Sequence, residues 1–439
     1  MFEFMSESFR KDSLGQLDLL TMLTDLSPRS FLVFQRSILG FLFVVGLNLY
    51  LSDTVCAAQL LGAANDYNVF TLGDFTQQGT DSLGRVAVGG KFDPGGTVGN
   101  PSLNGSGSYS VASNNPNQAG IANLVVGGNY RNGSTTINGN MVVGGTASVD
   151  GTVTGKLSVI GDLTRGYGQQ GGDVSGGHDI FYTGPDGVLS RITATRNVTI
   201  GGGGAFAGGV YYGGTFTNNN NFSPITSHFV SPAPVPPTLP INFASEAAFL
   251  KTLSGKLDAL SSTGTTTFTG NSAINTNGAL SFFGTHSSQD IFHVNTADLA
   301  HTYSLSITGV AGETIVINID GAAASMSNFG MSLSGVDRQH VLFNFYNGAN
   351  TSTFTTTGVG IQGTVLAPFT NINFAGGNID GTIIGNTIQG SGESHEFLFL
   401  GNVTFGPSSV STPEPTTFVS GILGTLAAGI LAYRRRNSV

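Results

Sequence analysis

Three short segments decide the fold of this 439-residue chain: LVVGGN at 124–129, MVVGGT at 141–146 and LSVIGD at 157–162. Their glycines Gly127, Gly144 and Gly161 follow one another at a step of 17 residues. Each segment is a run of aliphatic residues that ends in Gly, Asn or Asp, which tolerate the backbone of a tight turn. A repeated step of this length predicts a β-solenoid, in which each coil stacks its strands on the next and buries a continuous core.

Further repeats support a mainly β fold. The same core occurs as VAVGG at 86–90 and VTIGG at 198–202, and smaller strand-and-turn units stand between, such as TING at 136–139 and VDGTV at 149–153. Near the end of the chain, the pattern returns as QGTV at 362–365 and DGTI at 380–383, at a similar spacing. We therefore expect two blocks of coils, one before and one after the middle of the chain.

The segment between the two blocks differs from both. SPAPVPPTLP at 231–240 is rich in proline and should run extended. NFASEAAFLKTLSGKLDAL at 242–260 predicts one long amphipathic helix, with Leu250, Leu253 and Leu257 on its apolar face and Asn242 or Ser245 as its N-cap. We expect this helix to lie along the side of the solenoid. β-Branched and aromatic runs at 313–319 and 341–345 predict core strands after it.

Composition excludes several classes of protein. The chain has 65 glycines and only 10% charged residues, but 39% hydrophobic residues and 31 phenylalanines argue against disorder. Its net charge of −9 argues against a nucleic-acid partner, which requires a basic surface. The single cysteine, Cys56, falls in the leader discussed next, so the mature chain should have no internal disulfide.

The stretch at 1–58 is predicted to be a leader with a signal peptide. Arg36 precedes an apolar core at 38–51, and VCAA at 55–58 supplies the small residues of a cleavage site, which predicts a cut after Ala57 or Ala58. The leader is long, so either Met1 or Met22 could be the true start.

Residues 411–439 form a tail of three parts. Pro413, Glu414 and Pro415 precede an apolar run at 418–433, and Arg434, Arg435 and Arg436 follow it. This order resembles the PEP-CTERM sorting signal of Gram-negative bacteria. The resemblance implies that the secretion machinery and an exosortase act on the chain, which would be held transiently in the inner membrane by this tail. Terminal hydrophobic helices are therefore expected at both ends of the precursor. The alternative is a plain C-terminal membrane anchor.

The part between leader and tail, 59–410, resembles the choice-of-anchor A family of exported bacterial surface proteins. The matching segments are NVFTLGDF at 68–75, GRVAVGG at 84–90, GTVLAP at 363–368, GTIIG at 381–385 and GESH at 392–395. The resemblance implies an adhesive role at the cell surface or in the extracellular matrix. It also implies a β-solenoid with a flanking helix, similar to that of ice-binding proteins, and it supplies no catalytic residue or cofactor.

Two histidine clusters are the candidates for chemistry. His395 and Glu393 are weak candidates for a metal site or a general base, and His178 next to Asp179 is weaker still. The alternative is that they cap turns or close the core. The Asp-Gly pairs at Asp150, Asp186, Asp320 and Asp380 predict plain turns, because no EF-hand loop or calcium nonapeptide surrounds them.

Three classes of function remain. We expect a non-enzymatic adhesive or structural binding module, whose partner is an extracellular polysaccharide or another surface ligand. The second class is an ice-binding or other flat-face binder. It needs threonines in register, and only the local clusters Thr265–Thr267 and Thr355–Thr357 are seen. The third is a polysaccharide-active β-helix enzyme, which needs acidic and basic residues gathered in one groove.

Overall fold

The computed structural model describes residues 60–77, 79–94, 108–112, 121–131, 134–183, 191–202, 208–219, 225–348, 350 and 352–405. They fall in one compact unit, Gln59–Phe405. The predicted leader, its apolar core and the C-terminal tail lie outside them, as do the terminal hydrophobic helices. Within the described ranges, no helix has the length and apolarity that crossing a bilayer requires.

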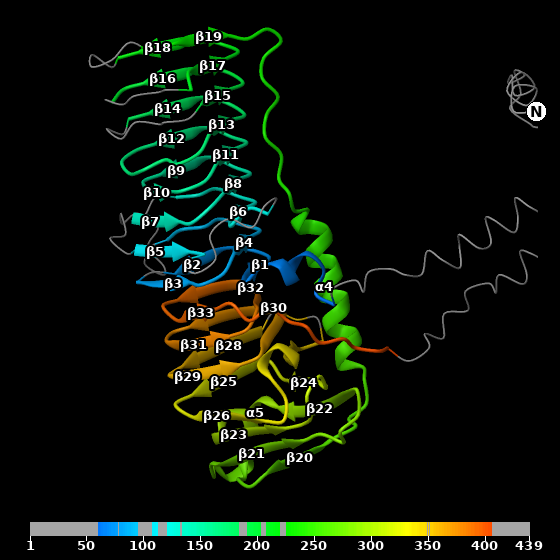
Figure 1. The fold of residues 1–439 in the computed structure, drawn as a ribbon. Coiled ribbons are helices and arrows are strands. Elements are labelled where there is room, and N and C mark those ends of the chain that lie inside the picture. The colour runs from blue at the N-terminus through cyan, green and yellow to red at the C-terminus, as the bar shows by residue number, and fades with distance from the viewer. Residues whose placement is uncertain are drawn as a thin grey trace, which may run out of the picture. The chain divides into compact units, whose positions relative to one another are not determined.

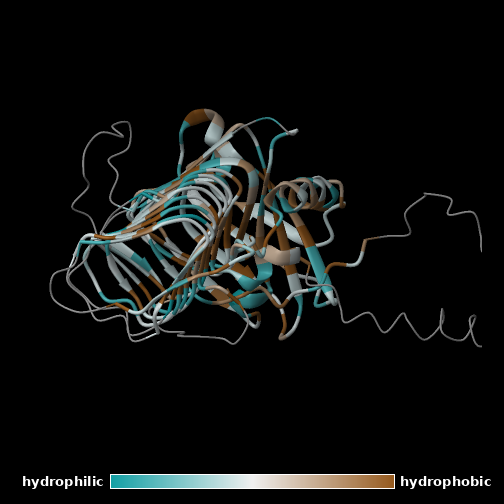
Figure 2. Ribbon diagram, turned by 90° about the horizontal axis from the view of Figure 1, so that it is seen from above, coloured by the Kyte–Doolittle hydropathy of each residue, from teal (hydrophilic) through white to brown (hydrophobic). Residues whose placement is uncertain are grey.

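The described chain is a stack of β coils with three sides, and one long helix lies along it (Figures 1 and 2). Strand pairing is parallel between all strands except β20 and β21. The mainly β prediction is therefore confirmed, and the fold is β-helix-like.

The side beside the helix, here the helix side, carries the longest run of paired strands. In stacking order it consists of β22 (Gln289–Asn295), β24 (Thr314–Asp320), β27 (Val341–Tyr346), the first part of β30 (Thr364–Phe374), the first part of β32 (Ile383–Gly390), β1 (Val69–Thr71), β4 (Val86–Val88), β6 (Leu124–Val126), β8 (Met141–Val143), β11 (Leu157–Val159), β13 (Val174–Gly176), β15 (Ile192–Ala194), β17 (Val210–Tyr212) and β19 (Ser227–Phe229).

The second side continues the long strands β30 and β32 around a corner. It consists of β25 (Ala323–Ser327), β28 (Ser352–Thr357), the later parts of β30 and β32, β2 (Phe75–Gln77), single bridges at Phe92 and Tyr130, β9 (Ala147–Val149), β12 (Leu163–Arg165), β14 (Ile180–Tyr182), β16 (Val198–Ile200) and β18 (Phe216–Asn218).

The third side is made of two sheets. One contains β20 (Thr265–Phe268), β21 (Gly278–Phe283), β23 (Thr302–Thr308) and β26 (Gly330–Ser334). The other contains β29 (Val359–Gln362), β31 (Gly377–Asp380), β33 (Glu393–His395), β3 (Thr80–Ser82), β5 (Ser108–Val111), β7 (Ser134–Ile137) and β10 (Gly151–Val153).

The repeats stack as predicted, with two corrections. Leu124 pairs with Met141 and Met141 with Leu157, so the second strand step is shorter than the first by a single residue. The predicted alignment of Gly161 with Gly144 is therefore wrong. Gly161 aligns with Gly145 instead, and its N–H donates to the carbonyl of Gly145. The segment at 198–202 has the sequence of the repeat but does not lie on the helix side with the other members. Val198 pairs with Ile180 on the second side.

Glycine is needed at the corners because the coils approach closely there. A Cβ on Gly144 would collide with the carbonyl oxygen of Gly127 in the preceding coil. Asparagine and aspartate have a different role at the same corner. Asn129 Oδ1 accepts from the N–H of Thr146 (3.0 Å), and Asn197 Oδ1 accepts from the N–H of Thr215 (2.8 Å). These side chains thus bond one coil to the next.

The first described coil lies in the middle of the stack rather than at an end. Val69 pairs with Val86 in one neighbouring coil and with Ile383 in the other, so β1 joins the two blocks (Figure 1). The side chain of Asn68 strengthens this junction by donating to the carbonyls of Gly381 (2.8 Å) and His395 (2.9 Å). One hydrophobic core consequently runs through both blocks.

The predicted helix is confirmed as α4 (Phe243–Asp258), which begins after the N-cap Asn242. Asn242 Oδ1 accepts from the N–H of Ser245 (3.1 Å). Leu250, Leu253 and Leu257 are buried against outward-facing aliphatic residues of the helix side. Other described helical elements are the short α5 (Thr296–Ala300) and the 3-10 turns η1 (Gly62–Asp66), η2 (Ser272–Ile274) and η3 (Arg338–His340).

A buried polar network fixes the second half of α4. Asn318 and Asn344 are neighbours in one row of the helix side, together with His293. Asn344 Nδ2 donates to Asn318 Oδ1 (2.8 Å), Ser254 Oγ donates to Asn344 Oδ1 (2.6 Å), and Asn318 Nδ2 donates to the carbonyl of Leu257 (2.9 Å). Satisfied networks of this kind specify a single docking geometry.

The docking of α4 should depend on one leucine. Leu250→Ala removes a fully buried side chain and should lower the free energy of unfolding by about 2–5 kcal/mol. Thr252→Ala, on the exposed face of the same helix, should change it by less than about 0.5 kcal/mol. Urea unfolding followed by circular dichroism measures both, and equal effects would contradict this packing.

A pair of carboxyl groups is buried at the corner between β21 of the third side and β22 of the helix side. Asp290 and Glu313 are almost fully buried. Thr263 Oγ1 (2.7 Å) and Thr285 N donate to Asp290, and Val310 N donates to Glu313 Oε2 (2.7 Å). Burial and the neighbouring Asp290 raise the pKa of Glu313 to about 7. Burial also acts to raise the pKa of Asp290, but the hydrogen bonds that Asp290 accepts outweigh this effect and lower its pKa. The pair therefore holds one proton in weakly acidic solution.

This pair predicts a pH dependence of stability. Because Glu313 has a raised pKa in the folded state, its contribution is full below about pH 4.5 and is lost as pH rises to about 7. The free energy of unfolding should fall by roughly 2 kcal/mol more in the natural chain than in Glu313→Gln between pH 5 and 7.5. Urea unfolding at several pH values gives this difference. Asp173→Asn, at an exposed aspartate that forms no described ion pair with a histidine, is the control and should leave the slope unchanged.

Candidate functional site

The broadest candidate binding surface lies on the third side, over β20, β21, β23 and β26. Strand residues alternate there between the core and the solvent. Leu280, Phe282, Leu305 and Ile307 point inward and are buried. The outward positions carry hydroxyl groups, here called the hydroxyl face: Thr265, Thr267, Ser281, Ser304, Ser306, Thr308, Ser332 and Ser334.

Strand register places these hydroxyls in rows. Thr267, Ser281, Ser306 and Ser332 are opposite one another across four strands. A second row contains Thr265, Phe283, Thr308 and Ser334, and a third contains Ala279, Ser304 and Gly330. Neighbouring strands lie about 4.8 Å apart, so the residues within each row repeat at that spacing. Ser306 Oγ donates to Ser281 Oγ (2.9 Å), which orients the first row.

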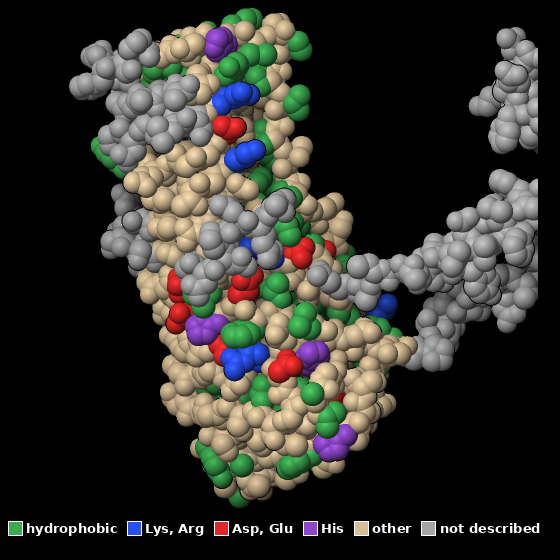
Figure 3. All heavy atoms as spheres, in the orientation of Figure 1, with side chains coloured by type: hydrophobic (Ala, Val, Ile, Leu, Met, Phe, Trp, Pro, Cys, Tyr) green, Lys and Arg blue, Asp and Glu red, His purple; other side chains and the backbone are tan. Residues whose placement is uncertain are grey.

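The hydroxyl face is neutral. None of the residues in its three rows is charged. In Figure 3 the lower part of the molecule, over β21, β23 and β26, is mostly tan, whereas red and blue side chains gather higher in the view. Two aromatic residues are exposed in these strands, Phe283 (47%) within the second row and Tyr303 (57%) at the register shift of β23. The surface thus combines hydroxyl donors and acceptors with apolar rings.

The two predicted threonine clusters lie on different sides. Thr265 and Thr267 belong to the hydroxyl face, whereas Thr355 lies on the second side in a row with Ser325, Asn373 and Gln389. The sequence steps that build the first row, from 267 to 281, 306 and 332, are unequal. A search for a fixed period therefore misses this face. The usable signal is the alternation of Ser or Thr with Leu, Ile or Phe in ALSFF at 279–283 and SLSIT at 304–308.

The structure brings the predicted residues His395 and Glu393 together in a charged cluster on β33. His395 Nδ1 lies 2.6 Å from Asp380 Oδ1, and His395 Nε2 lies 3.3 Å from Glu393 Oε1. Arg338 pairs with Asp380 and stacks on the ring of Phe397 at 4.7 Å. Both ring nitrogens thus already contact carboxylates, and a guanidinium neutralises one of them. The cluster bonds neighbouring coils, and a metal or general-base role for His395 and Glu393 stays a prediction.

The remaining predicted residues are not gathered into a site. His178 Nδ1 lies 3.8 Å from Asp162 Oδ1, and both side chains are more than half exposed. Asp150 and Asp320 precede Gly151 and Gly321, which have positive φ, as the predicted turns require. Ala57, Ala58, Pro413, Glu414, Pro415, Arg434, Arg435 and Arg436 lie outside the described residues, as does Asp186.

Comparison with known proteins identifies the family. The description "Putative Ice-binding-like adhesive domain" matches over residues 60–154 and 123–396, which together span most of the chain. Neither the search of curated proteins nor that of solved structures gave a match. The matched ranges include the junction coil, α4 and the hydroxyl face. The chain therefore belongs to the ice-binding-like adhesive domain family.

Proposed function

We propose that this protein is a non-enzymatic adhesive module that acts at the cell surface or in the extracellular matrix and binds a neutral polysaccharide through the hydroxyl face. The observation that carries the proposal is the set of in-register hydroxyl rows on β20, β21, β23 and β26. The family match supports the adhesive role.

The chemistry of the face suits a repeating, uncharged ligand. A single neutral hydrogen bond contributes only about 0.5–1.5 kcal/mol net, so one hydroxyl cannot hold a surface. Hydroxyl groups that repeat at strand spacing within a row can engage successive units of a polymer at once, and such multivalent contacts raise the overall affinity steeply. Exposed Phe283 and Tyr303 add apolar rings that can pack on the C–H faces of sugars. Without charges, binding should vary little with salt.

Ice binding is the second candidate function. A regular array of hydroxyl groups on stacked strands, together with the family's description, favours it. Phe283 interrupts the second row, however, and Ala279 and Gly330 leave the third row with a single hydroxyl group. The polysaccharide proposal accommodates these three interruptions. Thermal hysteresis of the purified chain, read beside polysaccharide binding, separates the two candidates.

The adhesion proposal makes a prediction about one serine. Ser306→Lys places a charge in the centre of the first row and should lower binding to an insoluble neutral polysaccharide, such as cellulose or chitin, at least tenfold. Ser175→Lys is the matched control, because Ser175 Oγ donates to Ser158 Oγ at the same 2.9 Å on the helix side. Co-sedimentation measures the bound fraction, and circular dichroism verifies folding. Equal loss in both variants, or none in Ser306→Lys, would remove the hydroxyl face as the binding surface.

The proposal also includes export as a choice-of-anchor A protein sorted by an exosortase. The signal-peptide pattern that ends at Ala57 and Ala58, and the tail with Pro413, Glu414 and Pro415, support it. Such a route delivers the adhesive domain to the outside and makes any attachment to the inner membrane transient.

The sorting proposal is tested by the mass of the mature protein. In a host that has an exosortase, the full chain should be found outside the cell, cut after Ala57 or Ala58 and near Pro413. Glu414→Ala should abolish the C-terminal cut and leave the N-terminal one. Intact-mass spectrometry of secreted and membrane fractions reads both ends. A natural chain that keeps its full C-terminus in the inner membrane would instead support the plain anchor.

A further inference from the structure

We propose that Asp258, His293 and Asp320 form a binding site for one divalent transition-metal ion of the Zn²⁺ type, which fastens the end of α4 to the helix side of the stack. This site lies on a different side from the hydroxyl face, so it does not depend on the proposed adhesive function.

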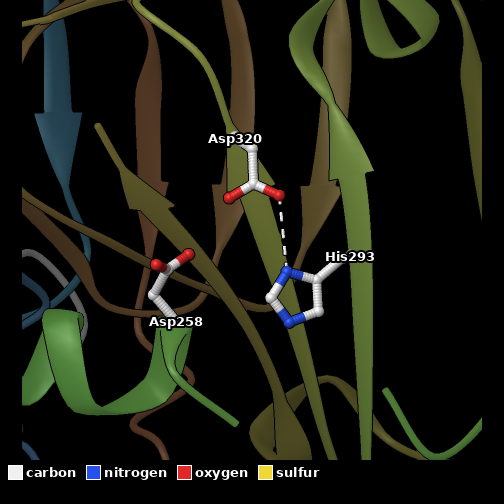
Figure 4. Close-up of side chains that lie close together, drawn as sticks. All are labelled: Asp258, His293 and Asp320. Carbon is white, nitrogen blue, oxygen red and sulfur yellow. Dashed lines mark hydrogen bonds and ion pairs between the residues drawn. The ribbon is translucent and has the colours of Figure 1, made fainter. Parts of the chain in front are cut away.

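The three side chains come from three elements and converge on one point (Figure 4). Asp258 is the last residue of α4, His293 lies on β22, and Asp320 ends β24. One potential ligand atom from each residue lies within 4.8 Å of the other two. His293 Nδ1 is 3.3 Å from Asp320 Oδ2, a separation usual for two ligands of one small ion.

The hydrogen bonding of His293 leaves a nitrogen for a metal. Its Nε2 lies 2.8 Å from the carbonyl oxygen of Leu260, which can only accept, so Nε2 carries the proton. Asn318 Nδ2 is a more distant neighbour of Nε2, at 3.3 Å, and already donates to the carbonyl of Leu257. Nδ1 is then the ring nitrogen that faces Asp320 and that would coordinate a metal ion. Metal-binding histidines commonly donate their other ring N–H to a carbonyl in this way.

Among the described residues, no lysine or arginine forms an ion pair with either carboxylate, and His293 is their only ion-pair partner. Asp258 Oδ1 is buried, and no described N–H or alcohol O–H group donates to it; its nearest polar neighbour is the carboxyl group of Asp320. Asp258 also ends a 16-residue helix, where the helix dipole disfavours a negative charge. Burial and the adjacent Asp320 raise the pKa of Asp258, although His293 opposes the shift. A cation between the three groups would satisfy the free oxygen and the Nδ1 lone pair together.

The donor set indicates the kind of ion. One imidazole nitrogen and two carboxylate oxygens suit Zn²⁺ and related first-row ions, whereas Ca²⁺ prefers oxygen ligands alone and more of them. Two ligands are held on paired strands, and the third is held by the buried network of Ser254, Asn344 and Asn318 beneath α4. Three protein ligands leave at least one position for water.

The test is metal binding by the full chain after treatment with EDTA. Isothermal titration with Zn²⁺ should give one site per chain, and Ca²⁺ should bind at least tenfold more weakly. Co²⁺ should produce a visible absorption band of a site with mixed nitrogen and oxygen ligands. Asp258→Asn and His293→Ala should each weaken Zn²⁺ binding at least tenfold and abolish the Co²⁺ band. His340→Ala is the matched control, because His340 lies 2.9 Å from Asp337 and no third potential ligand gathers there among the described residues. This variant should leave the Zn²⁺ affinity and the Co²⁺ band unchanged.

Stability provides an independent readout. Zn²⁺ should raise the Tm of the natural chain by a few degrees and leave that of Asp258→Asn unchanged. Without metal, Asp258→Asn should be at least as stable as the natural chain, since it removes one of two facing carboxylates. The proposal is overturned if Zn²⁺ fails to bind in a one-to-one ratio, or if Asp258→Asn binds Zn²⁺ as the natural chain does. In that case the three groups form a proton-sharing ion pair only.

Discussion

Register between successive coils is the constraint on which the rest of this structure depends. Parallel strands pair directly across coils, and a slip of one residue would turn core side chains outward. Gly144 permits the close approach of two coils, and Asn129 and Asn197 bond one coil to the next at the corner. The same register aligns Thr267, Ser281, Ser306 and Ser332, so the candidate binding surface is a direct result of how the core is stacked.

The sequence indicated the fold best where local rules apply. Aliphatic runs that recur at a near-constant step predicted stacked strands, and the spacing of Leu250, Leu253 and Leu257 with the cap at Asn242 predicted α4 almost to its ends. Changes of coil length could not be predicted, because a corner absorbs an extra residue without a compositional signal, and Gly161 was misaligned for this reason. The segment at 198–202 was grouped with the wrong strands because the same short sequence is used on two sides of the stack. The candidate site was harder still. The rows of the hydroxyl face join residues at unequal separations in the sequence. The cluster of Asp258, His293 and Asp320 was missed because its members are far apart in the chain and Asp320 has the sequence context of a turn residue.

Several polar and charged groups of the described stack are buried inside it. Asn318 and Asn344 fasten α4, Asp290 and Glu313 share a corner, and Arg165 is wholly buried with its guanidinium donating to backbone carbonyls such as that of Val149 (2.9 Å). Each of these groups forms hydrogen bonds with backbone or side-chain partners inside the stack. The hydroxyl face, in contrast, carries no charged residue, which suits the uncharged polymer proposed as its ligand.

The position of β1 between β4 and β32 has a consequence for how the chain is made. Asn68 contacts Gly381, 313 residues further on, so the coil synthesised first cannot be completed until nearly the whole domain has been produced. Contacts between such distant residues slow folding, because a large loop must close before they form. A chain built in this order stays incomplete while it is being translated. The middle coil, which joins the two blocks, is therefore completed only after β32 and β33 have been made, late in the synthesis of the domain.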